Sequence, residues 1–266
     1  MCGVIAMQSQ DFVDLNLFKK ILIESMVRGK HSTGVSWLEN DEIKTITRPL
    51  SADKFDMPNI KTKSIIGHCR YSTSSVKFNQ PIADDSISVA HNGVITQINP
   101  KKWGEIYDCD FTTECDSEII LRMLKKGIHP LQLDGSMSVV VLNKLNVSFF
   151  RNEERPLYYY KDKDNIIIAS TKDIFKRSLN LIPLKTKSCY EYKIDNFDLQ
   201  INGLKERFDR SVKQDDFTTW VLEKFKDHEL TPRPYQIETA YNIINNASCT
   251  LNNGVGFGSG NGGYFD

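Results

Sequence analysis

The chain opens with Cys2-Gly-Val-Ile-Ala-Met-Gln8, a short apolar run directly after Met1. A continuous apolar run of this length is typical of a buried strand. Apolar residues then recur at helical spacing over residues 15–27, which predicts an amphipathic helix, and Gly29 ends it. The fold is therefore expected to begin with a buried strand at the N-terminus, followed by a helix.

Strand and helix patterns alternate unevenly along the rest of the first two hundred residues. A second helix is expected to begin at Asp116 and to end before Gly127, and a short one at residues 172–179. Apolar and β-branched runs predict strands at residues 33–38, 42–48, 64–70, 86–91, 136–142, 147–151, 157–160, 165–170 and 190–194. Groups of strands separated by single helices favour a layered α+β domain over a parallel strand–helix alternation.

The character of the sequence changes after about Gly203. Two helices are expected at residues 217–226 and 235–246, separated by Thr231-Pro-Arg-Pro234, and residues 254–263 form a glycine-rich tail. We therefore expect one domain over residues 2–205 and a short helical extension with a glycine-rich tail over residues 206–266.

Composition narrows the possible partners. Lys plus Arg and Asp plus Glu each total 34 in 266 residues, so the net charge is zero and neither a nucleic acid nor a membrane surface is expected as a partner. The six cysteines form no paired metal-binding or disulfide framework, which favours reduced thiols and a cytoplasmic location. No phosphate-binding glycine motif links a strand to a helix, so no cofactor is expected. No metal is expected either, because the spacings of Cys69, Cys109 and Cys115 match no paired Cys-x-x-Cys arrangement.

Cys2 is a candidate nucleophile because of its position. Removal of Met1, which is usual before a small residue, would leave a thiol and a free α-amine on the same residue. An α-amine titrates near ~7.7–8.0, so it can accept the thiol proton close to neutral pH. By itself this pattern is weak, because a cysteine at the second position is more often a small buried residue.

Four further segments strengthen the case for catalysis. They are Arg28-Gly-Lys-His-Ser-Thr-Gly34, Gly67-His-Cys-Arg-Tyr-Ser-Thr73, His91-Asn-Gly93 and Thr113-Glu-Cys-Asp-Ser-Glu118. Each alone has a structural alternative: a glycine turn, a hairpin turn at His91-Asn-Gly93, or an ordinary helix cap at Asp116. Their joint occurrence in this order behind Met-Cys-Gly is hard to attribute to chance.

With these segments, residues 2–195 resemble the glutaminase domain of class II glutamine amidotransferases, such as those of glucosamine-6-phosphate synthase and amidophosphoribosyltransferase. The resemblance implies the four-layer αββα sandwich of the N-terminal-nucleophile hydrolases. It also implies that Cys2 attacks the glutamine side-chain amide and forms a γ-glutamyl thioester. Asn92 and Gly93 are then expected to donate hydrogen bonds to the oxyanion.

The same resemblance assigns the residues that select glutamine. Arg70 is expected to bind the α-carboxylate, with Thr73 as a neighbouring polar contact, and Asp116 to pair with the α-ammonium group. Arg28 and His91 are expected to support the nucleophile region. For both, a purely structural role is the alternative.

The acceptor of the ammonia is not apparent in the sequence. Only about sixty residues follow the expected glutaminase domain, so we expect the acceptor site on a partner synthetase or ligase. Two alternatives remain at this point: a stand-alone amidase acting on a γ-glutamyl or other amide, and a catalytically silent regulatory module.

Overall fold

The structure, a computed structural model, describes residues 2–71, 78–133, 135–152, 155–204, 214–226 and 231–245. The chain divides into two compact units, Met1–Glu206 and Arg207–Asp266.

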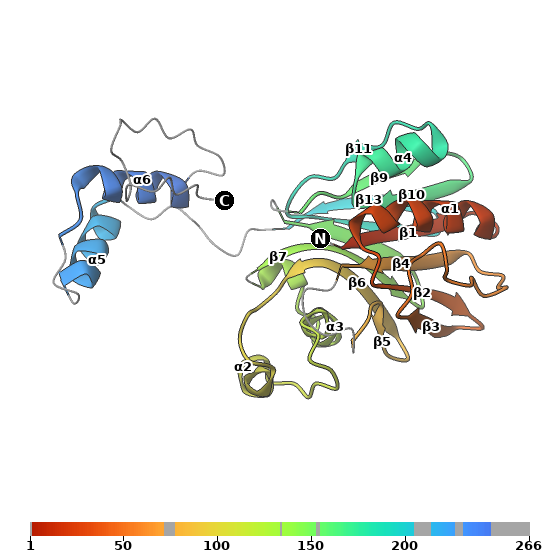
Figure 1. Cartoon of the computed structure of the whole chain (residues 1–266), viewed down its shortest axis with the longest axis horizontal. Coiled ribbons are helices and arrows are strands. Elements are labelled where there is room, and N and C mark those ends of the chain that lie inside the picture. The colour runs from red at the N-terminus through yellow and green to blue at the C-terminus, as the bar shows by residue number, and fades with distance from the viewer. Residues whose placement is uncertain are drawn as a thin grey trace. The chain divides into compact units, whose positions relative to one another are not determined.

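The first unit contains two antiparallel sheets (Figure 1). The first sheet has the spatial order β11-β9-β10-β1-β4-β2-β3, and the second has the order β13-β12-β8-β7-β6-β5. The strands of the first sheet are β1 (Gly3–Ser9), β2 (Ser32–Glu39), β3 (Glu42–Arg48), β4 (Ser64–Arg70), β9 (Tyr158–Lys161), β10 (Asn165–Ala169) and β11 (Leu184–Lys185). Those of the second are β5 (Ile82–Ala83), β6 (Ile87–Val94), β7 (Ser136–Asn143), β8 (Val147–Arg151), β12 (Tyr190–Asp195) and β13 (Asp198–Gly203).

Helices cover the outer face of each sheet. The first sheet carries α1 (Leu15–Ser25), which continues into the 3-10 turn η1 (Met26–Arg28), and α4 (Lys172–Leu179). The second carries α3 (Ser117–Lys125), and α2 (Trp103–Tyr107) lies on the same side (Figure 1). Short 3-10 turns are found at η2 (Pro100–Lys102) and η3 (Pro130–Gln132). The predicted four-layer αββα sandwich is confirmed.

The position of β1 explains why its sequence is apolar throughout. β1 lies between β10 and β4, so it is a central strand with a covered surface on both faces. Ile5 and Met7 face the core beneath α1, whereas Val4 and Ala6 belong to the core between the two sheets. Because successive side chains of a strand point to opposite faces, a strand buried on both faces needs apolar residues at every position.

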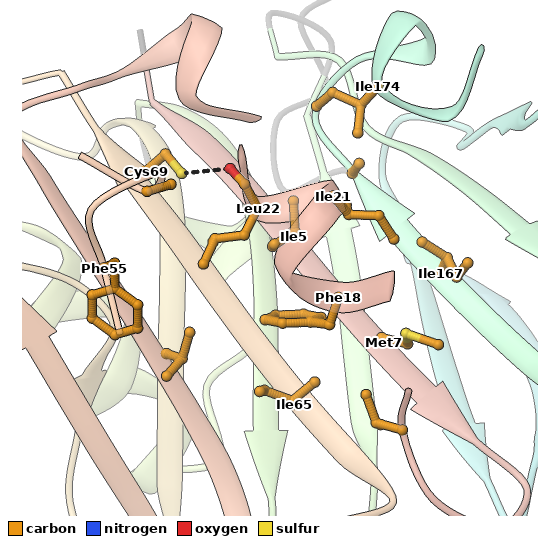
Figure 2. Close-up of a cluster of buried hydrophobic side chains, with 14 of the residues drawn as sticks. Ile5, Met7, Phe18, Ile21, Leu22, Phe55, Ile65, Cys69, Ile167 and Ile174 are labelled. Atoms are coloured by element: carbon orange, nitrogen blue, oxygen red, sulfur yellow. Dashed lines mark hydrogen bonds between the residues drawn. The ribbon is translucent and has the colours of Figure 1, made fainter. Parts of the chain in front are cut away.

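The core beneath α1 is closely packed (Figure 2). Phe18, Ile21 and Leu22 of α1 lie against β1 and β4, and the Cys69 thiol donates a hydrogen bond to the Leu22 carbonyl oxygen at 3.3 Å. Burial raises the pKa of the Cys69 thiol. Cys69 is therefore a packing residue that stays protonated at neutral pH.

Several local predictions differ from the structure. The predicted helix over residues 15–27 ends as an α-helix at Ser25, and its last turn tightens into η1. The short α2, β5 and β11 and the edge strand β13 were not predicted. β13 is largely exposed at the end of the second sheet, so it lacks the apolar pattern by which buried strands are recognised. The hairpin-turn alternative for His91-Asn-Gly93 is wrong, because these residues lie within β6 and pair with β7.

The second unit contains α5 (Gln214–Lys226) and α6 (Pro234–Asn245). Phe217, Val221 and Ile237 form a small core, to which Ala240 and Tyr241 add partly buried contacts. The predicted helices at residues 217–226 and 235–246 correspond to α5 and α6, whereas residue 246 and the glycine-rich stretch 254–263 lie outside the described residues. None of the helices in the described parts of the chain is both long and apolar enough to cross a membrane.

Candidate active site

Cys2 lies directly before β1 and is held by contacts on both sides of its backbone. Its N–H donates to Oδ1 of Asn92 at 3.0 Å, and its carbonyl oxygen accepts from Nε of Arg28 at 2.8 Å. Its thiol sulfur lies 3.9 Å from the carbonyl oxygen of Tyr71. The backbone of Cys2 is therefore fixed by β6 and η1, while its sulfur lies at the end of β4.

Within the described residues, only the oxygen of the Asn92 side-chain amide has a hydrogen-bond partner. Its Oδ1 accepts the Cys2 N–H, which orients the Nδ2 donors away from the Cys2 backbone. Nδ2 is buried and has no hydrogen-bond partner within the described residues. An unpaired buried donor costs about 1–3 kcal/mol, a cost that a group bound at this position would offset.

Gly93 follows Asn92 in a position that only glycine can occupy. Its φ is 156°, and a Cβ here would lie 1.8 Å from the Ser136 carbonyl oxygen and 2.7 Å from Nε2 of His91. The absence of a side chain therefore lets β6 and β7 approach closely beside Asn92.

His91 connects this end of β6 to neighbouring elements through hydrogen bonds. Its ring is buried; Nδ1 lies 3.1 Å from the Ser117 hydroxyl and Nε2 lies 3.3 Å from the Ser136 carbonyl oxygen. Its backbone N–H donates to Oε1 of Gln80 at 2.6 Å. Burial lowers the pKa of His91, although the nearby Asp116 carboxylate acts in the opposite direction. The imidazole is therefore neutral and joins β6 to α3 and β7.

Arg70 ends β4, one residue before Tyr71. Its Nη1 donates to the Phe78 carbonyl oxygen and to Oδ1 of Asn79 at 3.1 Å. Within the described residues no carboxylate forms an ion pair with Arg70, so its charge is uncompensated there. Thr73, which the sequence places beside Arg70 as a polar contact, lies outside the described residues.

Asp116 stands at the start of α3 but does not cap it. Its side chain makes no hydrogen bond to the first turn of its own helix, so the ordinary-cap alternative is wrong. Instead, Oδ2 accepts the N–H of Ile95, two residues beyond Gly93, at 2.7 Å. No lysine or arginine in the described part of the chain forms an ion pair with this carboxylate.

The Cys115 thiol shows that Arg70 and Asp116 belong to one region. Burial raises the pKa of Cys115; the Asp116 carboxylate raises it further, and the Arg70 guanidinium lowers it. One buried thiol is thus influenced by both charges. Arg70 precedes Tyr71, whose carbonyl oxygen lies near the Cys2 sulfur, and Asp116 accepts the N–H of Ile95, two residues beyond Gly93. Within the described residues, neither charge has an ion-pair partner.

Arg28 is half-buried and has a cationic neighbour that the sequence did not indicate. Burial lowers the pKa of Arg28, the Cys2 thiol raises it, and Arg155 lowers it. Arg155 donates from Nε to the Ser136 hydroxyl at 3.1 Å, and this hydroxyl also accepts the Val94 N–H at 3.3 Å.

Three polar residues around β6 were also missed: Gln80, Ser117 and Ser136. Gln80 and Ser136 lie in none of the four quoted segments, and Ser117 lies in one of them, but each acts through a contact with a residue from another element. The sequence could have indicated Arg155, because it lies within residues 2–195, the stretch that resembles the family.

Comparison with known proteins agrees with this geometry. A family model described as "Glutamine amidotransferase domain" matches residues 68–177. Glutamine–fructose-6-phosphate aminotransferase [isomerizing] of Chlamydia pneumoniae is 26% identical over 200 residues, which cover 66% of this chain and 32% of that protein. Amidophosphoribosyltransferase of Archaeoglobus fulgidus is 29% identical over 166 residues, which cover 56% of this chain and 34% of that protein. The matched region spans about a third of the length of these relatives.

Solved structures show the same fold. The glutamine phosphoribosylpyrophosphate amidotransferase of B. subtilis, in complex with ADP and GMP, superposes with a TM-score of 0.66 at 17% identity, covering 81% of this chain and 52% of that one. A structure described as the allosteric regulatory enzyme of purine biosynthesis gives a TM-score of 0.67 at 17% identity, with the same coverage.

The layered fold of the first unit is therefore that of these two solved structures. Residues 68–177 therefore match a glutamine amidotransferase domain, and the similarity to the two relatives supports this match.

Proposed function

We propose that this domain hydrolyses the side-chain amide of glutamine through Cys2 and supplies the ammonia to an acceptor site on a partner protein. The observation that carries the proposal is that the oxygen and the nitrogen of the Asn92 side-chain amide have different surroundings. Its oxygen holds the Cys2 nitrogen, and its buried Nδ2 has no partner among the described residues. That is the arrangement required of an oxyanion donor beside an N-terminal nucleophile.

In this mechanism Met1 is removed, so that the Cys2 nitrogen becomes an amine hydrogen-bonded to Asn92. The amine takes the thiol proton as the sulfur attacks the amide carbon, and Asn92 and Gly93 stabilise the resulting oxyanion. The C–N bond breaks, the amine passes the proton to the departing ammonia, and a γ-glutamyl thioester remains. Water then hydrolyses the thioester to glutamate and frees Cys2.

Arg70 and Asp116 supply the selection for glutamine in this proposal. A guanidinium suits a carboxylate, and a carboxylate suits an ammonium group, so the two unpaired charges match the α-groups of an amino acid. Thr73 adds a polar contact near Arg70. Arg28 supports the site by holding the Cys2 carbonyl oxygen, and His91 supports it by bracing β6.

The second unit is our candidate for the docking surface of the partner synthetase or ligase. On α5, Trp220 is 55% exposed, Leu222 46% and Phe225 37%, although α5 and α6 bury only a small core between them. Exposed apolar side chains of this size are typical of protein–protein contacts. We further propose a cytoplasmic location, because the cysteines of the described residues form no disulfide with one another.

The nucleophile is tested by comparing Cys2→Ala with Cys109→Ala. Cys2→Ala is expected to abolish glutamine hydrolysis while glutamine binding, measured calorimetrically, persists, because Arg70 and Asp116 are untouched. Cys109→Ala should retain full activity, and diazo-oxo-norleucine should label Cys2 alone. Labelling at Cys69 or Cys115 would reassign the nucleophile, and Met1 retained in a fully active preparation would contradict the amine mechanism.

Substrate choice is tested with Arg70→Lys. Lysine keeps the charge but loses the bidentate fork, so glutamine use should weaken substantially. Unchanged glutamine kinetics would favour an amidase that acts on other amides.

Docking is tested in the full chain with Trp220→Glu. This variant should keep basal glutaminase activity but lose stimulation by a co-purifying synthetase, whereas Ile182→Glu, at an exposed apolar residue of the first unit, should keep both. Unchanged stimulation of Trp220→Glu would move the docking surface elsewhere.

A further inference from the structure

The carboxylate of Glu118 has no part in the proposed chemistry, yet it is almost completely buried in the first turn of α3. A buried carboxylate is costly unless hydrogen bonds compensate for its lost solvation. Oε1 accepts from the backbone N–H and the hydroxyl of Thr112, both at 3.0 Å. Oε2 accepts from the backbone N–H and the hydroxyl of Thr113, both at 2.7 Å. Glu118 therefore binds two consecutive residues of the preceding loop.

These contacts extend to the residue before Asp116. The Thr113 hydroxyl, which donates to Glu118, also accepts the N–H of Cys115 at 3.2 Å. The N–H of Glu118 donates to the Cys115 carbonyl oxygen at 2.9 Å. Both peptide groups of Cys115 are thereby tied to Glu118, directly or through one hydroxyl.

Arg122 completes the arrangement one helical turn later. Its Nε and Nη2 both donate to Oε1 of Glu118, at 3.0 and 2.5 Å. Burial by itself raises the pKa of Glu118, but the hydrogen bonds from Thr112, Thr113 and Arg122 outweigh it and lower the pKa. Glu118 is therefore ionised and paired with Arg122. Within the described residues, the Asp116 carboxylate at the start of α3 has no such ion pair.

We propose that Glu118 is a positioning residue for glutamine binding. It holds the segment of residues 112–116 so that the Asp116 carboxylate stays directed at the N–H of Ile95, beside the oxyanion donors, instead of turning back to cap α3. The inference rests on the proposed function, because it assumes that Asp116 binds the substrate α-ammonium.

The experiment compares two electrophiles on the full-length protein. Diazo-oxo-norleucine carries the α-groups of an amino acid, whereas iodoacetamide carries none, so the ratio of their labelling rates at Cys2 reports α-group recognition. In Glu118→Gln one carboxylate oxygen becomes an NH₂ that cannot accept from threonine donors. This ratio should fall about 10-fold, as expected when a hydrogen bond to a charged group is weakened. The KM for glutamine should rise by the same factor with kcat little changed.

Glu114→Gln is the matched control, because Glu114 is exposed in the same segment. It should keep the wild-type ratio and KM. If Glu118→Gln does not fold, Thr113→Val decides, since it removes only the hydroxyl between Glu118 and Cys115 and should shift the ratio in the same direction. A wild-type ratio retained by a folded Glu118→Gln, or by Thr113→Val when the glutamine variant is unfolded, overturns the positioning role and leaves the proposed function intact. A wild-type protein without preference for the amino-acid electrophile overturns both.

Discussion

The helices α1 and α3 each begin at an aspartate, but only one of these aspartates caps its helix. Oδ1 of Asp14 accepts the N–H groups of Asn16 and Leu17 at 2.9 and 3.1 Å, as expected of a capping residue. Asp116 has the same residue type at the same kind of position, yet its carboxylate binds Ile95 across 21 residues of sequence. A residue that suits a local role but makes a distant contact instead is a sign of function.

The contacts beneath the two helices also differ: those beneath α1 are mainly apolar, whereas several beneath α3 are polar. Beneath α1, even the Cys69 thiol serves packing by donating to Leu22. Beneath α3, polar contacts reach the end of β6, through His91 with Ser117 and through Asp116 with Ile95. The contacts beneath α1 thus mainly pack the domain, whereas those beneath α3 reach the candidate site; Arg28 of η1, which binds the Cys2 carbonyl oxygen, is the exception on the α1 side.

The largest effect is expected when alanine replaces one of two glycines, Gly93 on the α3 side, compared with Gly67 on the α1 side. A Cβ at Gly93 would meet the Ser136 carbonyl oxygen, and relief of that clash displaces the oxyanion donors. Gly93→Ala should therefore lower kcat about 10²–10³-fold in a glutaminase assay.

Gly67→Ala is the counterpart of this prediction. Its Cβ would lie 2.9 Å from Cγ1 of Ile5 and 3.1 Å from Cζ of Phe18. It should cost ~1–3 kcal/mol of unfolding free energy through overpacking, with kinetics unchanged. A similar loss of kcat in both variants would remove the distinction between the two sides.

The second effect compares the two aspartates directly. Asp116→Asn can still accept the Ile95 N–H but loses the negative charge, so kcat/KM for glutamine should fall about 10–100-fold, mainly through KM. Asp14→Asn should change neither stability nor kinetics, because asparagine and aspartate cap helices about equally well. Steady-state kinetics at several glutamine concentrations distinguish these outcomes, and an unchanged KM for Asp116→Asn would contradict the ammonium-binding role.

Acid should destabilise both sheets, through the buried His68 in the first and the partly buried His129 beside the second. Burial lowers the pKa of His68 in β4 from 6.5 to about 3, and that of His129 beside β8 from 6.5 to about 4. Because the folded state holds both rings neutral, their contribution is complete above pH 6.5 and is lost as pH falls toward those values. Each of these two histidines should lower the unfolding free energy by about 1.4 kcal/mol for every pH unit below 6.5.

Urea unfolding at pH 7, 6 and 5 measures this slope. His129→Gln should reduce the slope of the unfolding free energy against pH by the contribution of one proton, about 1.4 kcal/mol per pH unit. An unchanged slope would mean that His129 is not held neutral in the folded state.

The smallest expected effect concerns Asp14 alone. Asp14→Ala removes both capping hydrogen bonds and should cost ~1 kcal/mol in thermal or urea unfolding. Its kcat and KM for glutamine should match the wild type, since α1 covers the packing side. A change in KM would show that the two sides are coupled.

Sequence alone determined the main elements of the first unit and the candidates for its site. The strands at residues 42–48 and 64–70 and the helix at residues 172–179 were predicted with the bounds that the structure shows. The strand at residues 64–70 was recognisable because its buried faces impose an apolar pattern. Cys2, Arg70, Asn92, Gly93 and Asp116 were named from motifs, since the chemistry they suit restricts residue type. Their catalytic and binding roles remain predictions.

Only the tertiary structure decided how these residues are held. The bond from Cys2 to Asn92 spans 90 residues and that from Ile95 to Asp116 spans 21, and no local pattern encodes such pairs. The contacts of Gln80, Ser117 and Ser136 likewise depend on which strand ends meet. Burial leaves a periodic trace in the sequence because it acts on whole faces of helices and strands. A hydrogen bond between two distant polar residues leaves none, because many residue types can supply each partner.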